Sequence, residues 1–418
     1  MLLRSATLAD GSVADVRICL SIIDAVAPSL DAQVGEPEID LTGHLLVPSF
    51  VEPHAHLDKA FLAERIENPT GDLMGAILAM ERSRHLVTVD DIAERAERAA
   101  RLMAANGVTV IRSHADVTVD NGLRSVEALL LVRERVRHLV DLQIVALTSW
   151  PITGRAGADS RALLRDAIAA GVDLVGGCPH LDTDPIEANA TLLSIAAAAG
   201  LPLDLHTDET LDPASLSLED LAMRVISTGF PHPVTASHCV SLGVQPASVQ
   251  RRVAEAVAAA GISVVALPHT NLFLQGRDHQ VAMPRGLTAI AALRTAGVDV
   301  AAGADNLQDP FNPMGRGDPL ETAALMVLVA HFLPDDAIAA VTARARRAVG
   351  LAPSLVEPGA PADLVAIPAT TVREALASQP GGRITFRGGT LVSGPTASAT
   401  ATSSAASAAA HPTPAAVA

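Results

Sequence analysis

Cysteine is scarce in this chain of 418 residues. The three cysteines, Cys19, Cys178 and Cys239, lie far apart, and no Cys-x-x-Cys pair occurs. A disulfide framework uses an even set of cysteines, and a thiolate zinc site uses closely spaced pairs. The sequence therefore indicates neither kind of site and fits a protein of a reducing compartment.

Basic residues are outnumbered by acidic ones. The chain has 30 lysines and arginines against 46 aspartates and glutamates, which gives a formal net charge of -16. Proteins bind nucleic acid largely by neutralising phosphates with lysine and arginine. We therefore expect no nucleic-acid partner.

Long apolar runs are also missing. No stretch approaches the roughly 18 uninterrupted apolar residues of a membrane-spanning helix, and the opening segment, residues 1–20, lacks a charged region followed by an apolar one, as in a signal peptide. With 49% hydrophobic and 18% charged residues, the composition is that of a well-buried globular protein. We expect a soluble cytoplasmic protein without a membrane partner, and the sequence leaves a homo-oligomer open.

Short apolar runs alternate with longer stretches rich in alanine, leucine, arginine and glutamate. Segments such as residues 90–107, 159–171 and 248–261 have the apolar spacing of helices, and each ends in glycine. Alternating strands and helices favour a parallel sheet, and eight such strands predict a (β/α)8 TIM-type barrel. The eight candidate strands are residues 44–56, 108–116, 141–150, 172–180, 201–209, 234–239, 262–270 and 298–306.

The two ends of the chain differ from its middle. Residues 1–48 and 351–394 contain short strand-like segments joined by turns, and we expect them to form one small β domain, although separate flaps fit the sequence equally. Residues 49–350 are expected to form the barrel. The tail, residues 395–418, is an alanine, serine, threonine and proline tract that predicts disorder.

Histidines stand at the ends of the candidate strands. His54 and His56 are two residues apart, so in an extended chain their side chains share one face. His206, His238 and Asp305 end three further strands. Any one of them alone is more often a structural residue or a cap, but their joint placement at the catalytic face of a barrel favours a metal site.

A hydrolase with a single metal needs nitrogen and oxygen ligands and a nearby carboxylate that moves protons. We predict that His54, His56, His206 and Asp305 hold one divalent transition metal. Glu209, three residues after His206, is the predicted proton shuttle, and His238 is expected to orient the water or hold developing charge.

These motifs, PSFVEPHAHLDK, HTDE, TASH, NLFLQGR and GADNLQDPFNPMG, resemble those of the amidohydrolase superfamily and, within it, of the cytosine deaminases. The resemblance covers about residues 1–394 and implies the same ligands and the same roles for Glu209 and His238. It also implies one zinc or iron ion without a carboxylated lysine, and the fourth candidate strand, residues 172–180, contains no lysine.

The sequence departs from that family at the expected pocket wall. Cytosine deaminases place a glutamine at the end of the third strand to read the pyrimidine edge, whereas this chain has Ser149 and Trp150. Asn306 stands in place of a second aspartate, and Phe311 in place of a tryptophan. These four residues are the candidates for binding substrate, together with His180; His114, Asp182 and His269 are weaker ones, with supporting roles equally favoured. Lys59 is interpreted as a loop charge.

The leading hypothesis is hydrolytic deamination of a cytosine-like, amino-substituted N-heterocycle by hydroxide bound to the metal. Glu209 would protonate the ring and then the leaving amine, while His238 and Asp305 would help to deprotonate water. Hydrolysis of a related cyclic amidine, cyclic amide or alkylamino-triazine is the alternative. A metal-free binding barrel, with the histidines only packed, ranks last. Cytosine itself is expected to be a poor substrate.

Overall fold

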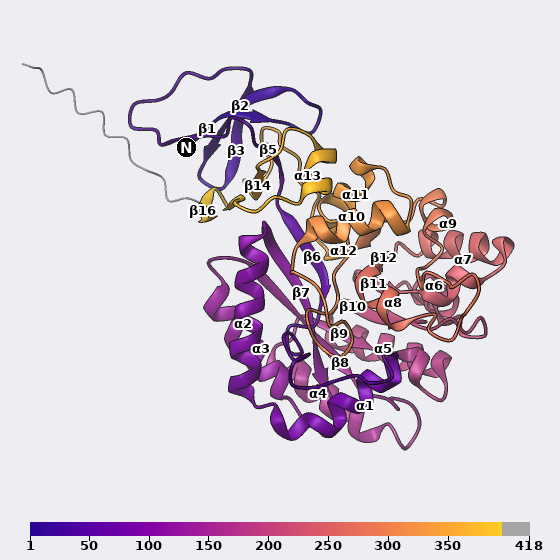
Figure 1. Ribbon diagram of the computed structural model, residues 1–418. Coiled ribbons are helices and arrows are strands. Elements are labelled where there is room, and N and C mark those ends of the chain that lie inside the picture. Colours follow the sequence, from indigo (N-terminus) through magenta and orange to yellow (C-terminus); the bar gives the residue numbers. More distant parts are fainter. Residues whose placement is uncertain (395–418) are drawn as a thin grey trace, which may run out of the picture.

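The core of the molecule is a parallel barrel. The computed structural model describes residues 1–394, and the predicted disordered tail, residues 395–418, lies outside them. Eight strands pair in chain order, each parallel to the next, which confirms the predicted barrel (Figure 1). They are β6 (Phe50–Ala55), β7 (Val108–Val117), β8 (Asp141–Thr148), β9 (Leu174–Gly177), β10 (Leu203–Thr207), β11 (Val234–His238), β12 (Ser263–Ala266) and β13 (Val300–Ala302).

Most of the helices surround the barrel and cover the outer faces of its strands. Alanine- and leucine-rich stripes on these helices pack against the strands in one continuous hydrophobic core. Within residues 1–394, no helix is both long and apolar enough to cross a membrane. The helices are α1 (Leu73–Ser83), α2 (Val89–Ala105), α3 (Arg124–Val136), α4 (Ala158–Ala170), α5 (Pro185–Ala199), α6 (Ser217–Thr228), α7 (Ala247–Ala259), α8 (Pro268–Leu274), α9 (Ile290–Thr295), α10 (Pro319–Val329), α11 (Pro334–Ala340) and α12 (Ala343–Ala348).

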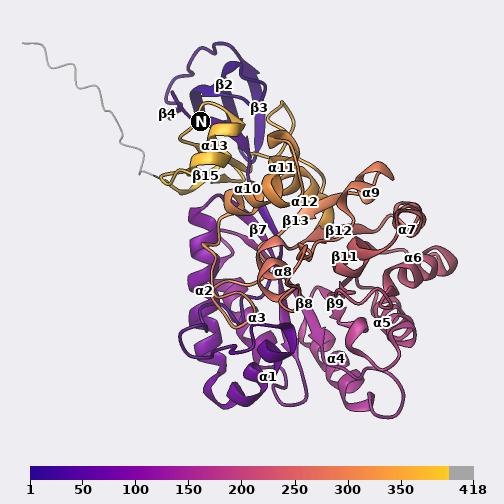
Figure 2. The ribbon, with the colours of Figure 1, turned by 45° about the vertical axis from the view of Figure 1, so that its right-hand side comes forward.

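A second sheet joins the two ends of the chain, as predicted. The N-terminal strands and the yellow C-terminal strands lie together beside the barrel in both views (Figures 1 and 2). β5 and β14 make the connection through antiparallel pairing, which excludes separate flaps. The sheet contains β1 (Leu2–Thr7), β2 (Val13–Cys19), β3 (Ile22–Ala27), β4 (Glu38–Asp40), β5 (Leu45–Pro48), β14 (Leu364–Ile367), β15 (Ile384–Arg387) and β16 (Thr390–Ser393), with α13 (Val372–Ser378) between β14 and β15.

Three of the candidate strands need correction, and one of them, residues 172–180, ends as a strand at Gly177 because a short 3₁₀ helix, Pro179–Leu181, follows. Residues 44–56 form two strands in different sheets, because the Ser49 amide donates to the carbonyl of Asp363 in the small domain, and the next amide, of Phe50, donates to Gly107 beside the barrel. Residues 262–270 end as a strand at Ala266, since Pro268 begins α8. His269 therefore lies on a helix.

The barrel closes through the segments that carry the predicted ligands. Ala55, at the end of β6, bridges to Asp305, just beyond β13. The Asp305 amide donates to the His54 carbonyl, and the His56 amide donates to the Asp305 carbonyl, both at 3.0 Å. The buried carboxylate of Glu52 accepts from the amides of Ala304 at 3.1 Å and His54 at 3.2 Å. The hydrogen bonds that close the barrel thus also bring the predicted metal ligands of its first and last strands together.

A buried ion pair crosses the barrel interior beneath the site. Arg112 on β7 donates to the Asp204 carboxylate on β10 at 2.8 Å. The same guanidinium also reaches Thr235 on β11 and the carbonyl of Ala348 in α12. Both charged side chains are shielded from water, so each depends on the other for its stability in the interior.

We expect Arg112→Met to destabilise the fold strongly, because Asp204 would keep a buried charge without its partner. Breaking a buried pair in this way costs about 3–5 kcal/mol. The control is Arg347→Met, which breaks the half-exposed pair with Asp299 and should cost about 1 kcal/mol or less. Denaturant unfolding measures both, and equal losses would contradict the assigned role of Arg112.

Candidate active site

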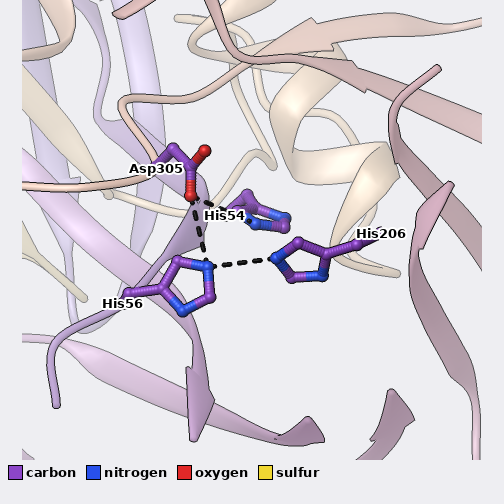
Figure 3. Close-up of side chains that lie close together, drawn as sticks. All are labelled: His54, His56, His206 and Asp305. Atoms are coloured by element: carbon purple, nitrogen blue, oxygen red, sulfur yellow. Dashed lines mark hydrogen bonds and ion pairs between the residues drawn. The ribbon is translucent and has the colours of Figure 1, made fainter. Parts of the chain in front are cut away.

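Four of the predicted residues meet at the carboxyl ends of the barrel strands. His54 and His56 come from the end of β6, His206 from β10 and Asp305 from the segment after β13 (Figure 3). One ligand atom from each residue lies within 4.8 Å of the ligand atoms of the other three. His56 Nε2 is 3.1 Å from His206 Nε2 and 3.2 Å from Asp305 Oδ1, and His54 Nε2 is 3.5 Å from the same oxygen.

The donor atoms in this cluster fit a divalent cation. Among the described residues, His54 Nε2 and both carboxylate oxygens of Asp305 are buried without a hydrogen-bond partner. Buried polar atoms normally have partners, so atoms without one that converge on a point indicate an absent ligand. Three imidazole nitrogens and one carboxylate oxygen suit zinc or iron.

The protonation states also suit a cation. Burial lowers the pKa of His206 well below its usual range and lowers that of His56 as well, which keeps both rings neutral with lone pairs free. Burial alone would raise the pKa of Asp305, but the adjacent imidazoles of His54 and His56 outweigh it and hold the carboxyl well below its usual range. Metal ligands must be deprotonated in this way.

Glu209 and His238 flank the cluster. Glu209 Oε1 lies 3.5 Å from His238 Nδ1, and His238 Nε2 lies 3.9 Å from Asp305 Oδ2. Burial, and then the nearby charge of Asp305, raise the pKa of Glu209 well above its usual range. Burial lowers the pKa of His238 to about 3. A carboxyl that keeps its proton thus stands beside an imidazole that does not.

Backbone strain marks two of these positions. Asp305 has φ 66° and His238 has φ 65°. Non-glycine residues seldom adopt this left-handed conformation, which is found preferentially where surrounding structure enforces it. At Asp305 the enforcing contacts are the two barrel-closing hydrogen bonds. At His238 the ring is also held by Asn271, whose amide lies 3.2 Å from Nδ1.

A second layer of side chains orients the histidines. His54 Nδ1 lies 2.9 Å from the Ser237 hydroxyl on β11, and His56 Nδ1 lies 3.0 Å from Lys59 Nζ. A serine hydroxyl can accept the N–H on the far nitrogen of a metal-ligating imidazole and so fix its orientation, whereas an ammonium can only donate. Both rings point their Nε2 atoms toward Asp305.

A cavity of about 680 Å³ opens above the cluster, and four of the predicted wall residues line it: Ser149, Trp150, Asn306 and Phe311. His180 does not line it; its Nδ1 faces the His206 carbonyl at 3.2 Å, so it supports β10. Asp182 accepts hydrogen bonds from the loop around Thr153, and His269 contacts Thr322.

Charged residues that sequence reasoning did not select also line the cavity, among them Lys59, Arg84 and Asp116. Lys59 is buried, which corrects its interpretation as a loop charge. Its ammonium lies 2.6 Å from Asp116 Oδ1, and Arg84 donates to the other oxygen of Asp116 at 3.0 Å. Asp116 could have been selected from the sequence, because it stands at the end of a candidate strand as the histidines do. Arg84 follows α1, whose place over the cavity no short motif predicts.

The fold and the site together define a barrel hydrolase with a cluster able to hold a divalent metal. The sequence comparison agrees, since the model of the amidohydrolase family matches residues 62–393. The chain belongs to the amidohydrolase family, and its predicted likeness to the cytosine deaminases is confirmed. It is therefore a hydrolase of carbon–nitrogen bonds other than peptide bonds.

Named relatives act on different rings. Pterin deaminase of Rhizobium rhizogenes is 34% identical over 387 residues, which are 91% of this chain and 87% of the relative. The crystal structure of 5-methylcytosine deaminase from Klebsiella pneumoniae matches with a TM-score of 0.86 at 30% identity, over 94% of this chain and 97% of that one. N-isopropylammelide isopropylaminohydrolase from Burkholderia multivorans matches with a TM-score of 0.81 at 32% identity, over 94% and 97%.

Proposed function

We propose that this amidohydrolase hydrolytically deaminates an amino-substituted, cytosine-like N-heterocycle that is larger than cytosine, with a pterin as the leading candidate. Water would replace the amino group on a ring carbon, and ammonia would leave. The observation that carries the proposal is the pairing of the His54, His56, His206 and Asp305 cluster with the proton-holding Glu209 in one cavity.

The four clustered residues would hold the metal. A divalent cation held there would supply Lewis-acid chemistry for the attack of water. A metal-free binding barrel is disfavoured, because such a protein would leave His54 Nε2 and the Asp305 carboxylate buried without partners.

Glu209 and His238 divide the proton transfers. Glu209 holds a proton on its buried carboxyl and is placed to give it to a ring nitrogen, to take a second proton from the added water and to pass that one to the departing amine. His238, neutral and with Nε2 at 3.9 Å from Asp305 Oδ2, is placed to orient the attacking water or to hold charge that develops there. Two titratable groups with pKa values shifted in opposite directions are a recognised basis for acid–base catalysis.

The size of the cavity favours a ring larger than cytosine. Ligand pockets of about 300–1,000 Å³ accommodate drug-sized molecules, and the volume here, about 680 Å³, is generous for a single six-membered ring. Trp150 adds a broad flat wall. A fused bicyclic aminoheterocycle fits these dimensions, and the pterin deaminase relative points to the same class.

A second candidate is removal of an alkylamino group from a triazine. Leu73, Ile77 and Met80 of α1 form an apolar wall of the cavity, which could bury an N-alkyl substituent. The N-isopropylammelide relative supports this reading.

We expect the purified protein to carry about one transition-metal ion per chain, since the cluster offers four ligands. His206→Ala should lose most of the metal, because it removes a central ligand. His138→Ala, at an exposed position, is the control and should retain it. Elemental analysis of protein prepared without chelator provides the measurement, and metal-free wild type would contradict the proposed site.

Glu209→Gln should retain metal but lose about 10² to 10⁴-fold in turnover, the usual contribution of a general acid–base group. The amide keeps the shape of the side chain but cannot transfer the proton. The matched control is Glu255→Gln on the exposed face of α7. Ammonia release and metal content are measured together, and undiminished turnover in Glu209→Gln would remove this residue from the mechanism.

A substrate panel tests the choice of ring. We expect kcat/KM for pterin to exceed that for cytosine by at least about tenfold, since a single ring leaves wall contacts unmade, and about 1.4 kcal/mol of lost contact gives that factor. The panel includes isocytosine and N-isopropylammelide, with Glu209→Gln as the blank. If cytosine is the best substrate, the size argument is wrong; if no compound releases amine, the proposed reaction is wrong.

A further inference from the structure

We infer that the Lys59–Asp116 ion pair reads the lactam edge of the substrate, meaning a ring carbonyl next to a ring N–H. This inference rests on the proposed function and names the feature of the ring that the cavity selects. The pair would replace the glutamine expected at the third strand.

The pair presents a donor beside an acceptor in the cavity wall. Lys59 Nζ lies 2.6 Å from Asp116 Oδ1, and both residues are buried and line the cavity. When His56 ligates through Nε2, its Nδ1 carries the ring proton and accepts nothing from the ammonium. The acceptors of the ammonium are then Asp116 and, at 3.4 Å, Asp58, which leaves one of its three protons for a ligand. The Asp116 carboxylate accepts from Lys59 and Arg84, and a carboxylate has about four acceptor sites.

A lactam edge matches this arrangement. Its carbonyl oxygen can accept a hydrogen bond from the Lys59 ammonium. Its neighbouring N–H can donate one to the Asp116 carboxylate at the same time. Hydrogen bonds to charged groups are about twice as strong as neutral ones. A ring without the carbonyl would leave one proton of the buried ammonium without an acceptor, which disfavours binding of that ring.

The position of the pair also fits. Asp116 on β7 is in register with Leu147 on β8, so it lies one strand away from the Ser149 and Trp150 segment. Lys59 contacts His56, which belongs to the predicted metal cluster. A ring that contacts the pair therefore lies next to the reaction centre.

The residues at the expected glutamine position are less suited to hydrogen bonding with a lactam edge. The Ser149 hydroxyl lies 3.2 Å from the Ser160 hydroxyl, which occupies part of its hydrogen-bonding capacity. The Trp150 indole is a donor only. Neither offers the donor and acceptor side by side that a lactam edge requires.

The test measures binding without turnover. Quinazolin-4(3H)-one carries the lactam edge, quinazoline lacks it, and neither has an amino group to lose. Isothermal titration calorimetry on the full-length, metal-loaded protein gives a Kd for each probe. Wild type should bind quinazolin-4(3H)-one at least about tenfold more tightly.

Lys59→Met should reduce this preference by about 10- to 100-fold, the range for one lost charge-assisted hydrogen bond. Affinity for quinazoline should change little. Lys59→Arg, which retains a donor, should restore part of the preference. Asp116→Asn removes the carboxylate and should also reduce the preference, so it provides a second test if Lys59→Met does not fold.

Arg84→Met is the matched control, because it removes the other cation on Asp116 and leaves the Lys59 contact in place. Both probes should weaken by the same factor in this variant. Metal content and melting temperature are measured on every preparation. Equal binding of the two probes by wild type, or equal weakening of both in Lys59→Met, overturns the inference. Because these probes release no ammonia, the result is independent of the substrate panel.

Discussion

The backbone pairing around Asp305 is the constraint on which the rest of the site depends. Strands at the two ends of an open sheet would carry their side chains far apart. Here the hydrogen bonds between His54, His56 and Asp305 close the sheet into a barrel. Asp305 adopts a left-handed conformation in doing so, and its carboxylate consequently faces imidazoles from β6 and β10. The strain is local, and the contacts that enforce it also build the cluster.

The two buried carboxyl groups of the site differ in protonation because their neighbours differ. Asp305 has imidazoles as partners and stays ionised, whereas Glu209 lies beside the charge of Asp305 and keeps its proton. The difference is set by neighbours rather than by depth, because both side chains are almost inaccessible to water. One residue is thereby suited to hold a cation and the other to donate a proton, so a single pocket contains both halves of a hydrolytic mechanism.

Most of the architecture was predictable from the sequence, because it rests on local signals. Alternating apolar runs and glycine-ended helices predicted the barrel, and the spacing of His54 and His56 predicted that their rings converge. The division of residues 44–56 between two sheets was not predictable, since it depends on where Ser49 and Phe50 find carbonyl partners in distant segments.

The residues of the cavity wall were harder to predict than the cluster of predicted metal ligands. Lys59 looked like a loop charge because nothing in HLDK reveals that Asp116, 57 residues later, lies against it. Buried ion pairs between distant segments leave no periodic pattern in the sequence. The domain boundaries, and the roles given to the individual site residues, stay predictions.

The separation between the predicted metal cluster and the cavity wall is consistent with relatives of one fold that are named for different substrates. Relatives about one-third identical to this chain are named for a pterin, for 5-methylcytosine and for N-isopropylammelide. Fold alone therefore does not select the ring. In our proposal the cluster at the strand ends supports cleavage of a bond from carbon to nitrogen, while the cavity wall reads the size and hydrogen-bonding pattern of the ring. The proposed wall residues lie on α1, at Trp150 and in the Lys59–Asp116 pair, and they are separate from the barrel-closing residues. Substitutions in the wall can thus alter the preferred ring without disturbing the contacts that close the barrel.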